Sequence, residues 1–169
     1  MSGAQVSQVD ISVVKVNYRH PKQGADLLQL MQHYATDPMG GAKALPDKVI
    51  EQLLPTLAST PTALSLLAYQ GERAVGLANC FLAFSTFNCA PILNIHDLVV
   101  HKGMRRQGVG QLLLTAATQH AKALDCCKIT LEVLSENTSA RDAYVKAGFA
   151  PYQLRPDTGI AEFWQKPLT

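Results

Sequence analysis

Residues 92–111 read ILNIHDLVVHKGMRRQGVGQ, and this stretch decides the fold. Its first part, 92–100, is apolar and partly β-branched, which predicts a strand that Pro91 introduces at its start. A short basic loop follows, and an amphipathic helix begins near Val109. A strand that enters a helix through a glycine-rich turn leaves the first amides of that helix without partners. The turn is therefore predicted to bind an anion.

The anion that suits this loop best is a pyrophosphate. Gly108 and Gly110 let the backbone approach a ligand closely, and Arg105 and Arg106 add charged donors that suit phosphate. The loop lacks the lysine and hydroxyl residue of a P-loop, because Val109 and Gly110 occupy those positions. It also lacks the third glycine of the dinucleotide-binding fingerprint. A basic surface turn without a ligand remains the alternative reading of the glycine spacing.

Outward from this stretch, alternating and helical patterns divide the rest of the chain into strands and helices. Strands are expected at 10–17, 62–69, 74–83, 92–100, 128–134, 149–154 and 161–166. Helices are expected from Pro21 to the Asp37-Pro38 stop, from Pro46 through Leu54, from Val109 to Leu124, and from Asn137 to Ala147. We predict an α/β fold of the mixed α+β kind, in which about four helices flank a mixed sheet of about seven strands.

Composition limits the class of protein. The chain has 169 residues, of which 47% are hydrophobic and 17% charged, so it is predicted to fold as a single domain over 1–169. A net charge of +2 is too small to predict a nucleic acid or membrane partner. No apolar run approaches the roughly 20 residues of a membrane span, and the first residues do not resemble a signal peptide. We expect a soluble, cytoplasmic protein.

The four cysteines are Cys80, Cys89, Cys126 and Cys127. Adjacent cysteines do not easily pair with each other, and the sequence lacks the two closely spaced Cys or His pairs typical of a zinc site. We therefore predict reduced thiols and no metal site.

Two motifs resemble those of one enzyme family. Residues 105–110, RRQGVG, look like the Q/R-x-x-G-x-G/A signature of the GNAT superfamily of acetyl-CoA-dependent N-acetyltransferases. Residues 137–149, NTSARDAYVKAGF, are similar to the family's second motif, N-x-x-A-x-x-x-Y-x-x-x-G-F. The motifs occur in the family's order, and the resemblance covers about 74–164. It implies a mostly antiparallel GNAT-like sheet that is splayed in the middle, with acetyl-CoA as cosubstrate.

The resemblance also assigns the coenzyme site. In the family, the loop amides hold the pyrophosphate, and the preceding strand pairs with the pantetheine arm as an extra strand would. Family structures separate this strand from the next one, commonly at a bulge. The coenzyme-binding residues implied are Leu98, Val99, Val100, Arg105, Arg106, Gln107, Gly108, Val109, Gly110, Gln111, Asn137 and Tyr144.

Tyr144 is the predicted general acid. Transfer of the acetyl group expels a thiolate, which leaves more readily if a proton arrives as the C–S bond breaks. Asn137 lies seven residues before Tyr144, so both face one side of the predicted helix. Asn137 is expected to hold a polar group of the pantetheine while Tyr144 reaches the sulfur. A half-buried packing role is the alternative for Tyr144.

The base is predicted to be His96, whose imidazole can accept a proton near pH 7. Polyamine acetyltransferases of the family tend to have Leu-Glu-Asp here, whereas this chain has Ile95, His96 and Asp97. Strand alternation puts His96 and Asp97 on opposite faces unless a bulge intervenes. Asp97, Glu132 and water are alternative bases, and a structural role is the alternative for His96.

The acceptor site is implied between the first helix-loop-helix, the splayed strands and a closing hairpin. Tyr34, Asp37 and Phe84 are the predicted substrate-binding residues, with Asp37 placed to bind a cationic amine. Helix termination explains Asp37 equally well. We predict direct acetyl transfer to the primary amine of a small molecule in a ternary complex. Members of the family are often dimers, so the resemblance is compatible with a homodimer, but the sequence itself does not locate an interface. The alternatives are an acyl-CoA-binding sensor or subunit, a protein N-terminal or lysine acetyltransferase, and a phosphate-binding protein without acyl chemistry.

Overall fold

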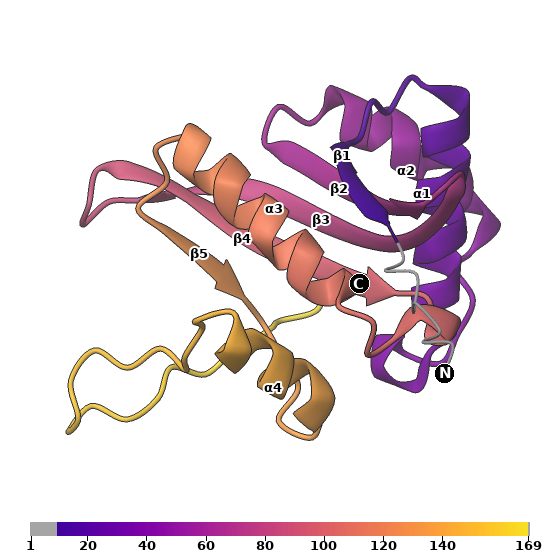
Figure 1. Cartoon of the computed structure of the whole chain (residues 1–169). Helices are drawn as coiled ribbons and strands as arrows, with labels where there is room; N and C mark the ends of the chain where they lie inside the picture. The colour runs from indigo at the N-terminus through magenta and orange to yellow at the C-terminus, as the bar shows by residue number, and fades with distance from the viewer. Residues whose placement is uncertain (1–9, 169) are drawn as a thin grey trace, which may run out of the picture. The chain divides into compact units, whose positions relative to one another are not determined.

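The computed structural model describes residues 10–168, and the chain forms two compact units, Met1–Leu131 and Glu132–Thr169 (Figure 1). The strands of the first unit are β1 (Ile11–Lys15), β2 (Ala63–Gln70), β3 (Arg73–Ser85), β4 (Ala90–Val100) and β5 (Lys128–Leu131). Its helices are α1 (Pro21–Ala35), α2 (Asp47–Ser59) and α3 (Val109–Ala123), with short 3-10 turns η1 (Pro38–Gly40) and η2 (Lys102–Met104).

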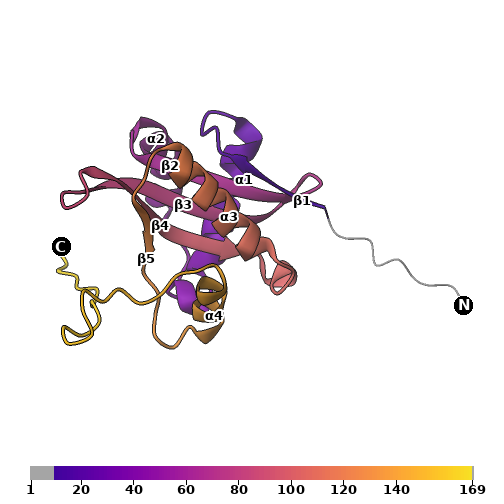
Figure 2. The same ribbon diagram turned by 60° about the vertical axis from the view of Figure 1, so that its left-hand side comes forward.

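The strands of the first unit form one sheet in the order β1-β2-β3-β4-β5 (Figure 2). Neighbouring strands are antiparallel except β4 and β5, which run parallel. Helices α1 and α2 pack on one face of the sheet, and α3 packs on the other. The sheet is therefore mixed and mostly antiparallel, as predicted, and has its core on both faces.

The core residues explain why each helix packs where it does. On α1, Leu27 and Leu30 are almost fully buried and face the sheet beside Leu77 and Val99. On the opposite face, α3 lies close to β3 at Gly76, where an added Cβ would come within 2.8 Å of Val109 Cγ1. Glycine at this position lets α3 approach the strand closely, which fixes the start of that helix against the sheet.

The second unit contains α4 (Thr138–Lys146), so residues 10–168 contain four α-helices, in line with the prediction of about four. Asn137 caps α4 by accepting a hydrogen bond from the Ala140 amide at 3.2 Å. Most side chains after the helix are exposed, including the aromatic rings of Phe163 and Trp164. None of the described helices is both long enough and apolar enough to cross a membrane.

The prediction of about seven strands is wrong, because the described residues contain a sheet of five. The segments 149–154 and 161–166 were expected to be strands, but the pairing found here is one isolated bridge from Gln153 to Ile160, the residue just before the second segment. Their aromatic and β-branched residues suit a strand, but a strand also needs a neighbour along its length. Pro151 cannot donate a ladder hydrogen bond, and most of these side chains are exposed.

Candidate functional site

Strand β4 is paired differently along its length. On one side β3 pairs with the whole strand, whereas on the other side β5 pairs only from Ile92 to Ile95. Beyond that point, from Asp97 to Val100, no described strand pairs with the second edge of β4. Peptide groups on such an edge are available to an extended ligand that adds itself as a strand. The three residues predicted to lie along pantetheine, 98–100, are on this edge.

A β-bulge lies where the pairing with β5 stops. Asn79 is opposite Asp97 and Cys80 is opposite Ile95, which leaves His96 as the extra residue. A bulge resets the alternation of side chains along a strand. The condition for His96 and Asp97 to share a face is therefore met.

Contacts on β3 identify that face. The His96 ring meets the ring of Phe81 edge-on at 5.8 Å between centroids, and Asp97 Oδ2 accepts a hydrogen bond from Asn79 Nδ2 at 3.0 Å. Asn79 and Phe81 are two residues apart on one strand, so they project from the same side. Phe81 packs against the core cluster that includes residues of α1. His96 and Asp97 therefore lie on the α1 side of the sheet, with His96 exposed and Asp97 half-buried.

The charge of Asp97 affects two neighbouring groups. Burial raises the pKa of the Cys80 thiol to about 12, and the nearby Asp97 carboxylate adds to the effect. Burial also raises the pKa of the Tyr34 phenol, and the negative charges of Asp97 and Asp37 raise it further. Tyr34, on α1, is thus close to both carboxylates and stays neutral at physiological pH.

The loop after β4 presents backbone amides at the start of α3. Gly108 is the N-cap residue of α3 and has a φ of 84°. No side chain makes a capping hydrogen bond at this end of the helix. Among the described residues, nothing accepts a hydrogen bond from the amides of 106–110. Gln107 closes the loop by donating from Nε2 to the Gly103 carbonyl at 3.1 Å. Free amides and the helix dipole make this loop suited to a phosphate group.

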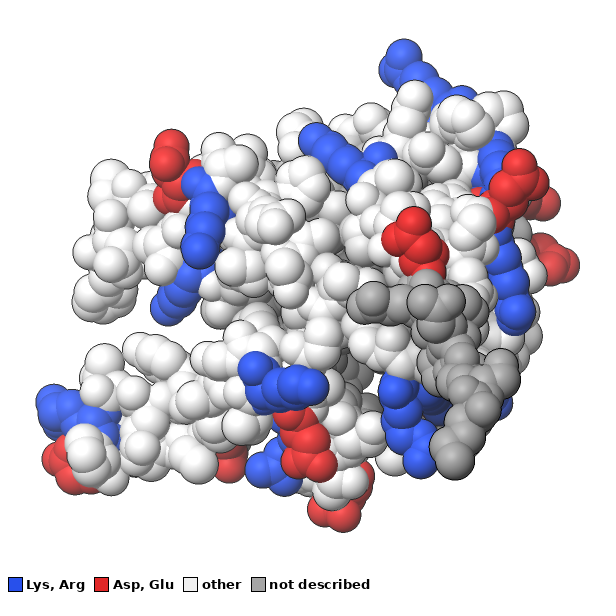
Figure 3. Space-filling view, viewed as in Figure 1, with Lys and Arg blue, Asp and Glu red and all other residues white. Residues whose placement is uncertain are grey.

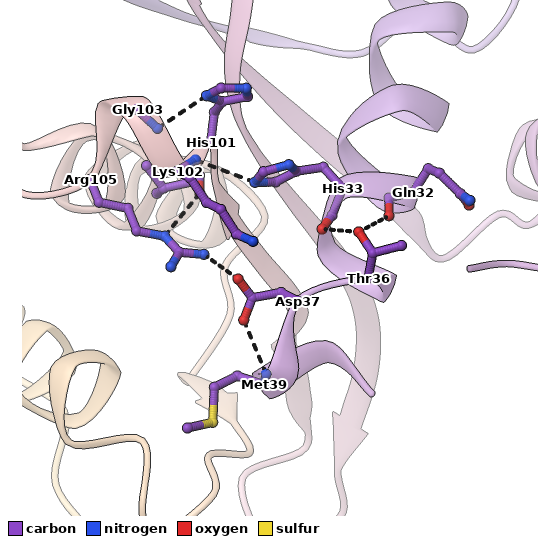
Figure 4. A network of polar contacts seen from close by, with 10 residues as sticks. Gln32, His33, Thr36, Asp37, Met39, His101, Lys102, Gly103 and Arg105 are labelled. Atoms are coloured by element: carbon purple, nitrogen blue, oxygen red, sulfur yellow. Dashed lines mark hydrogen bonds and ion pairs between the residues drawn. The ribbon is translucent and has the colours of Figure 1, made fainter. Parts of the chain in front are cut away.

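The two arginines of the loop are used differently. Arg105 Nη2 makes an ion pair with Asp37 Oδ2 at 2.7 Å, and the Asp37 side chain is only 8% exposed (Figure 4). The Arg105 hydrogen bond and a second one from the Met39 amide hold the pKa of Asp37 below its usual value. Arg106 is exposed and makes no ion pair within the described residues. In this structure the carboxylate predicted to bind an amine and a guanidinium predicted to bind phosphate contact each other.

Two histidines make a second connection between α1 and the loop. The rings of His33 and His101 stack with centroids 4.8 Å apart and planes 12° from parallel. His33 Nε2 accepts a hydrogen bond from the Lys102 amide at 3.3 Å, and His101 Nδ1 accepts one from the Gly103 amide at 3.2 Å (Figure 4). Burial lowers the pKa of His33, with His101 and then Lys102 and Arg105 as further causes. Both rings accept from an amide, which requires each to be neutral at that nitrogen.

The remaining predicted residues lie elsewhere. Phe84 is exposed near the β3–β4 hairpin, five residues along β3 from Asn79. Tyr144 is on α4 in the second unit, where it is half-buried and meets the Phe149 ring at 6.0 Å. The loop at 101–110, which was predicted to bind the coenzyme and is called the coenzyme loop below, belongs to the first unit together with Asp97 and Tyr34. On the face in Figure 3, Lys and Arg are interspersed with Asp and Glu and form no large area of one sign.

Sequence reasoning missed Asn79, which is 3% exposed and is the direct partner of Asp97. A signal was present, because Asn79 is a polar residue in the apolar strand that precedes Cys80, and buried polar side chains need partners. The partner itself is 18 residues away in the sequence. Local sequence patterns therefore predict that Asn79 has a polar partner but do not identify the partner residue.

Comparisons with known proteins identify the family of the chain. A family model described as the acetyltransferase (GNAT) family matches residues 26–149, which is more than half of the chain. No curated protein sequence matches the chain.

Among solved structures, the chain is similar to an aminoglycoside acetyltransferase, meta-AAC0020, from an uncultured soil metagenomic sample. That structure shares 18% identity over 93% of this chain and 96% of its own, with a TM-score of 0.74. The aminoglycoside N-acetyltransferase AAC(6')-Iy in complex with a bisubstrate analog shares 16% identity, over 94% of this chain and 99% of its own, with a TM-score of 0.73. A transcriptional regulator from Bacillus halodurans C-125 shares 20% identity, over 92% of this chain and 100% of its own, with a TM-score of 0.72. At these identities the structural likeness establishes the fold.

Proposed function

The chain belongs to the GNAT acetyltransferase family, and from that premise we propose that it moves the acetyl group of acetyl-CoA directly to the primary amine of a small molecule. The observation that carries the proposal is the bulge at His96. It coincides with the end of β5 pairing, so the half-buried carboxylate of Asp97 lies beside the free edge of β4. A strand edge for the coenzyme arm and a proton acceptor for the amine are thereby adjacent.

The first unit has the groups that coenzyme A requires. The unpaired edge at 98–100 suits the amides of pantetheine, and the partnerless amides at 106–110 suit the pyrophosphate. Gly108 leaves open space where a Cβ would stand, so a phosphate can approach the backbone there. Arg106 is the exposed guanidinium of this loop that makes no ion pair within the described residues, and it would add a charged contact. The coenzyme, when bound, supplies the activated acetyl thioester.

The chain's own residues would manage the protons. An alkylamine is protonated at neutral pH, so it must lose a proton before its nitrogen forms a bond to the acetyl carbon. Asp97 accepts that proton, and His96, exposed on the same face, carries it to solvent. As the C–S bond breaks, Tyr144 donates a proton to the leaving sulfur. No cysteine is needed as a nucleophile.

The charges of the acceptor face favour an amine with one positive charge. Asp37 is neutralised by Arg105 at 2.7 Å, which leaves Asp97 as the carboxylate beside Tyr34 that is open to a cation. The phenol of Tyr34 and the ring of Phe81 would contact the apolar or aromatic part of the acceptor molecule. A single carboxylate suits a monoamine better than a polycation such as an aminoglycoside.

The test is coenzyme binding followed by turnover. Isothermal titration with acetyl-CoA should give a dissociation constant in the micromolar range, and release of free thiol should be seen with a panel of monoamines. The panel also contains a diamine, an aminoglycoside and a peptide N-terminus, so that each acceptor class is compared directly. Binding without turnover on any acceptor would overturn acetyl transfer in favour of a sensor. Absence of binding would overturn both readings.

A further inference from the structure

A line of polar side chains crosses the sheet and ends at Asp97. Ser65 on β2 is directly opposite Asn79 on β3, which is directly opposite Asp97 on β4. Ser65 Oγ donates to Asn79 Oδ1 at 2.6 Å, and Asn79 Nδ2 donates to Asp97 Oδ2 at 3.0 Å. Tyr18, just after β1, adds a fourth member, with its hydroxyl 2.9 Å from Ser65 Oγ. We call Tyr18, Ser65 and Asn79 the polar relay.

The hydrogen bonds of the polar relay run in one direction. Ser65 has a single hydroxyl hydrogen, which goes to Asn79, so Tyr18 must donate to Ser65. The second hydrogen of Asn79 Nδ2 points to Met31 Sδ at 3.2 Å. If the amide were turned over, its oxygen would oppose Asp97 and the repulsion would disfavour that arrangement. Three successive donors therefore point toward the carboxylate and fix the position of one of its oxygens.

The polar relay is not needed to fill the core. Ser65 is 1% exposed and Asn79 is 3% exposed, and their neighbours along the strands are buried apolar residues such as Leu64, Leu66 and Ala78. Apolar side chains of similar volume would pack on this face without any demand for partners. Every buried polar side-chain atom in the described residues has a partner, so the relay is complete. The relay leads out of the core to the half-buried Asp97, which accepts from Asn79.

We propose that Tyr18, Ser65 and Asn79 are positioning residues for acetyl transfer. They hold one carboxylate oxygen of Asp97, so that the other faces the acceptor amine. This inference rests on the proposed function. In the step concerned, an N–H bond of the ammonium group breaks and an O–H bond forms at Asp97. The electron pair of the broken bond stays on nitrogen, which is then able to attack the thioester.

Other titratable groups also face Asp97. Tyr34 approaches from α1, Cys80 follows Asn79 on β3, and His96 precedes Asp97 on β4. Because the pKa of Tyr34 is raised from 10.0 and that of Cys80 to about 12, both groups stay neutral between pH 5 and pH 9. The His96→Gln substitution removes the imidazole. An acidic limb that remains in the pH profile of kcat/KM in this background is therefore assigned to the carboxylate.

The experiment compares two serine variants and one asparagine variant by pH profile. In Asn79→Leu the ionised carboxylate loses its donor, so kcat should fall about tenfold or more and the acidic limb of kcat/KM should move to higher pH. Ser65→Ala should cause a smaller change in the same direction, and Ser65→Thr, which keeps the hydroxyl, should restore the wild-type profile. The dissociation constant for acetyl-CoA should stay within about twofold of wild type in all three.

Tyr18→Phe has a matched control in Tyr69→Phe. Tyr69 also donates its hydroxyl to a carboxylate, Asp26 Oδ2, at 2.6 Å, but this pair lies outside the polar relay. Tyr18→Phe should shift the profile slightly and Tyr69→Phe should leave it unchanged. Equal profiles for the two variants would remove Tyr18 from the relay.

A double-mutant cycle separates positioning from a purely structural effect. In an Asp97→Asn background, Asn79→Leu should cause no further loss of kcat, because the group it orients is gone. A full additional loss would overturn the inference. Wild-type turnover, measured first, tests the proposed function by itself. If the wild type transfers acetyl and the Asn79→Leu profile does not move, the inference fails while the proposed function stands.

Discussion

Around Asp97 the polar groups have their partners inside the chain, whereas the amides from Arg106 to Gly110 have none among the described residues. The first region lies in the sheet, where Asn79 is almost fully buried, and the second joins an exposed loop, up to Gly108, to the start of α3. Buried polar groups must be paired for the fold to be stable, while exposed amides remain hydrated until a ligand replaces the water. The polar contacts around Asp97 are thus complete in the folded chain, whereas the loop amides are left for a ligand, which we propose is coenzyme A.

This difference predicts two kinds of variant. A substitution in the first region should change turnover, because the positions of its groups are set before any ligand arrives. A substitution in the second should change coenzyme affinity, because the loop is free to rearrange when it is empty.

The largest effect is expected for Asp97→Asn. The Asn79 amide can still donate to the new side-chain oxygen, so the fold should be kept, but the proton acceptor is lost. We expect kcat to fall by about 10²- to 10⁴-fold, the usual scale for general acid–base catalysis. Steady-state release of free thiol measures it, and calorimetry should give an unchanged affinity for acetyl-CoA. Unchanged kcat would exclude Asp97 as the base.

Tyr144→Phe tests whether turnover also depends on a residue in neither region. Tyr144 is on α4, and removal of its hydroxyl should lower kcat by about tenfold or more with the dissociation constant of acetyl-CoA unchanged. The matched control is Tyr152→Phe. Tyr152 is an exposed tyrosine in the same unit and has no proposed role in the reaction. If both variants turn over at the wild-type rate, Tyr144 is not the general acid.

Gly108→Val should affect the second region alone. A β-branched residue is strained at a φ of 84°, and an empty loop relieves the strain by changing conformation. The bound conformation then becomes costly, so we expect acetyl-CoA to bind about tenfold more weakly. Gly71→Val is the matched control, since Gly71 also has a positive φ, 57°, and open space at its Cβ, but lies in the β2–β3 turn. Both variants should lower the melting temperature slightly, and weaker coenzyme binding in Gly71→Val would contradict this explanation.

The two regions also differ in how far the sequence predicts them. The strand over 92–100, the loop and the helix from Val109 follow from local patterns, and the structure has them within two residues of the predicted bounds. The free amides follow as well, because they result from a glycine-rich turn that enters a helix.

The acceptor face is less predictable because its contacts join distant residues. A bulge adds one residue without any distinctive sequence, so strict alternation put His96 and Asp97 on opposite faces. Asp37 and Arg105 are 68 residues apart, and the sequence around either residue does not indicate that the two form an ion pair. The two expected C-terminal strands have suitable side chains, but whether a strand forms depends on a neighbour that local patterns do not specify.

The two regions are connected through α1, and the smallest effect concerns this connection. His33 on α1 accepts from the Lys102 amide, and its pKa is lowered from the ordinary value of 6.5 mainly by burial. As the pH falls below 6.5, the unfolded chain binds a proton at His33 more readily than the folded chain does. This contribution to stability is therefore present above pH 6.5 and lost as the pH falls through the lower folded pKa. The lowered pKa of Asp37 acts at more acidic pH, so it does not interfere.

We accordingly expect His33→Gln to reduce the pH dependence of stability between pH 7.5 and pH 5.5. Over that interval the melting temperature of the wild type should fall by on the order of 1 °C more than that of the variant. The control is His20→Gln, at the other end of the same helix, where the ring accepts from the Gln23 amide at 3.4 Å and makes no contact with the coenzyme loop. Protonated His33 cannot accept from the Lys102 amide, so the wild type should also bind acetyl-CoA more weakly at pH 5.5 than at pH 7.5. If His33→Gln keeps the full pH dependence of both quantities, the histidine does not connect the acceptor face to the coenzyme loop, and the ion pair between Asp37 and Arg105 does so alone.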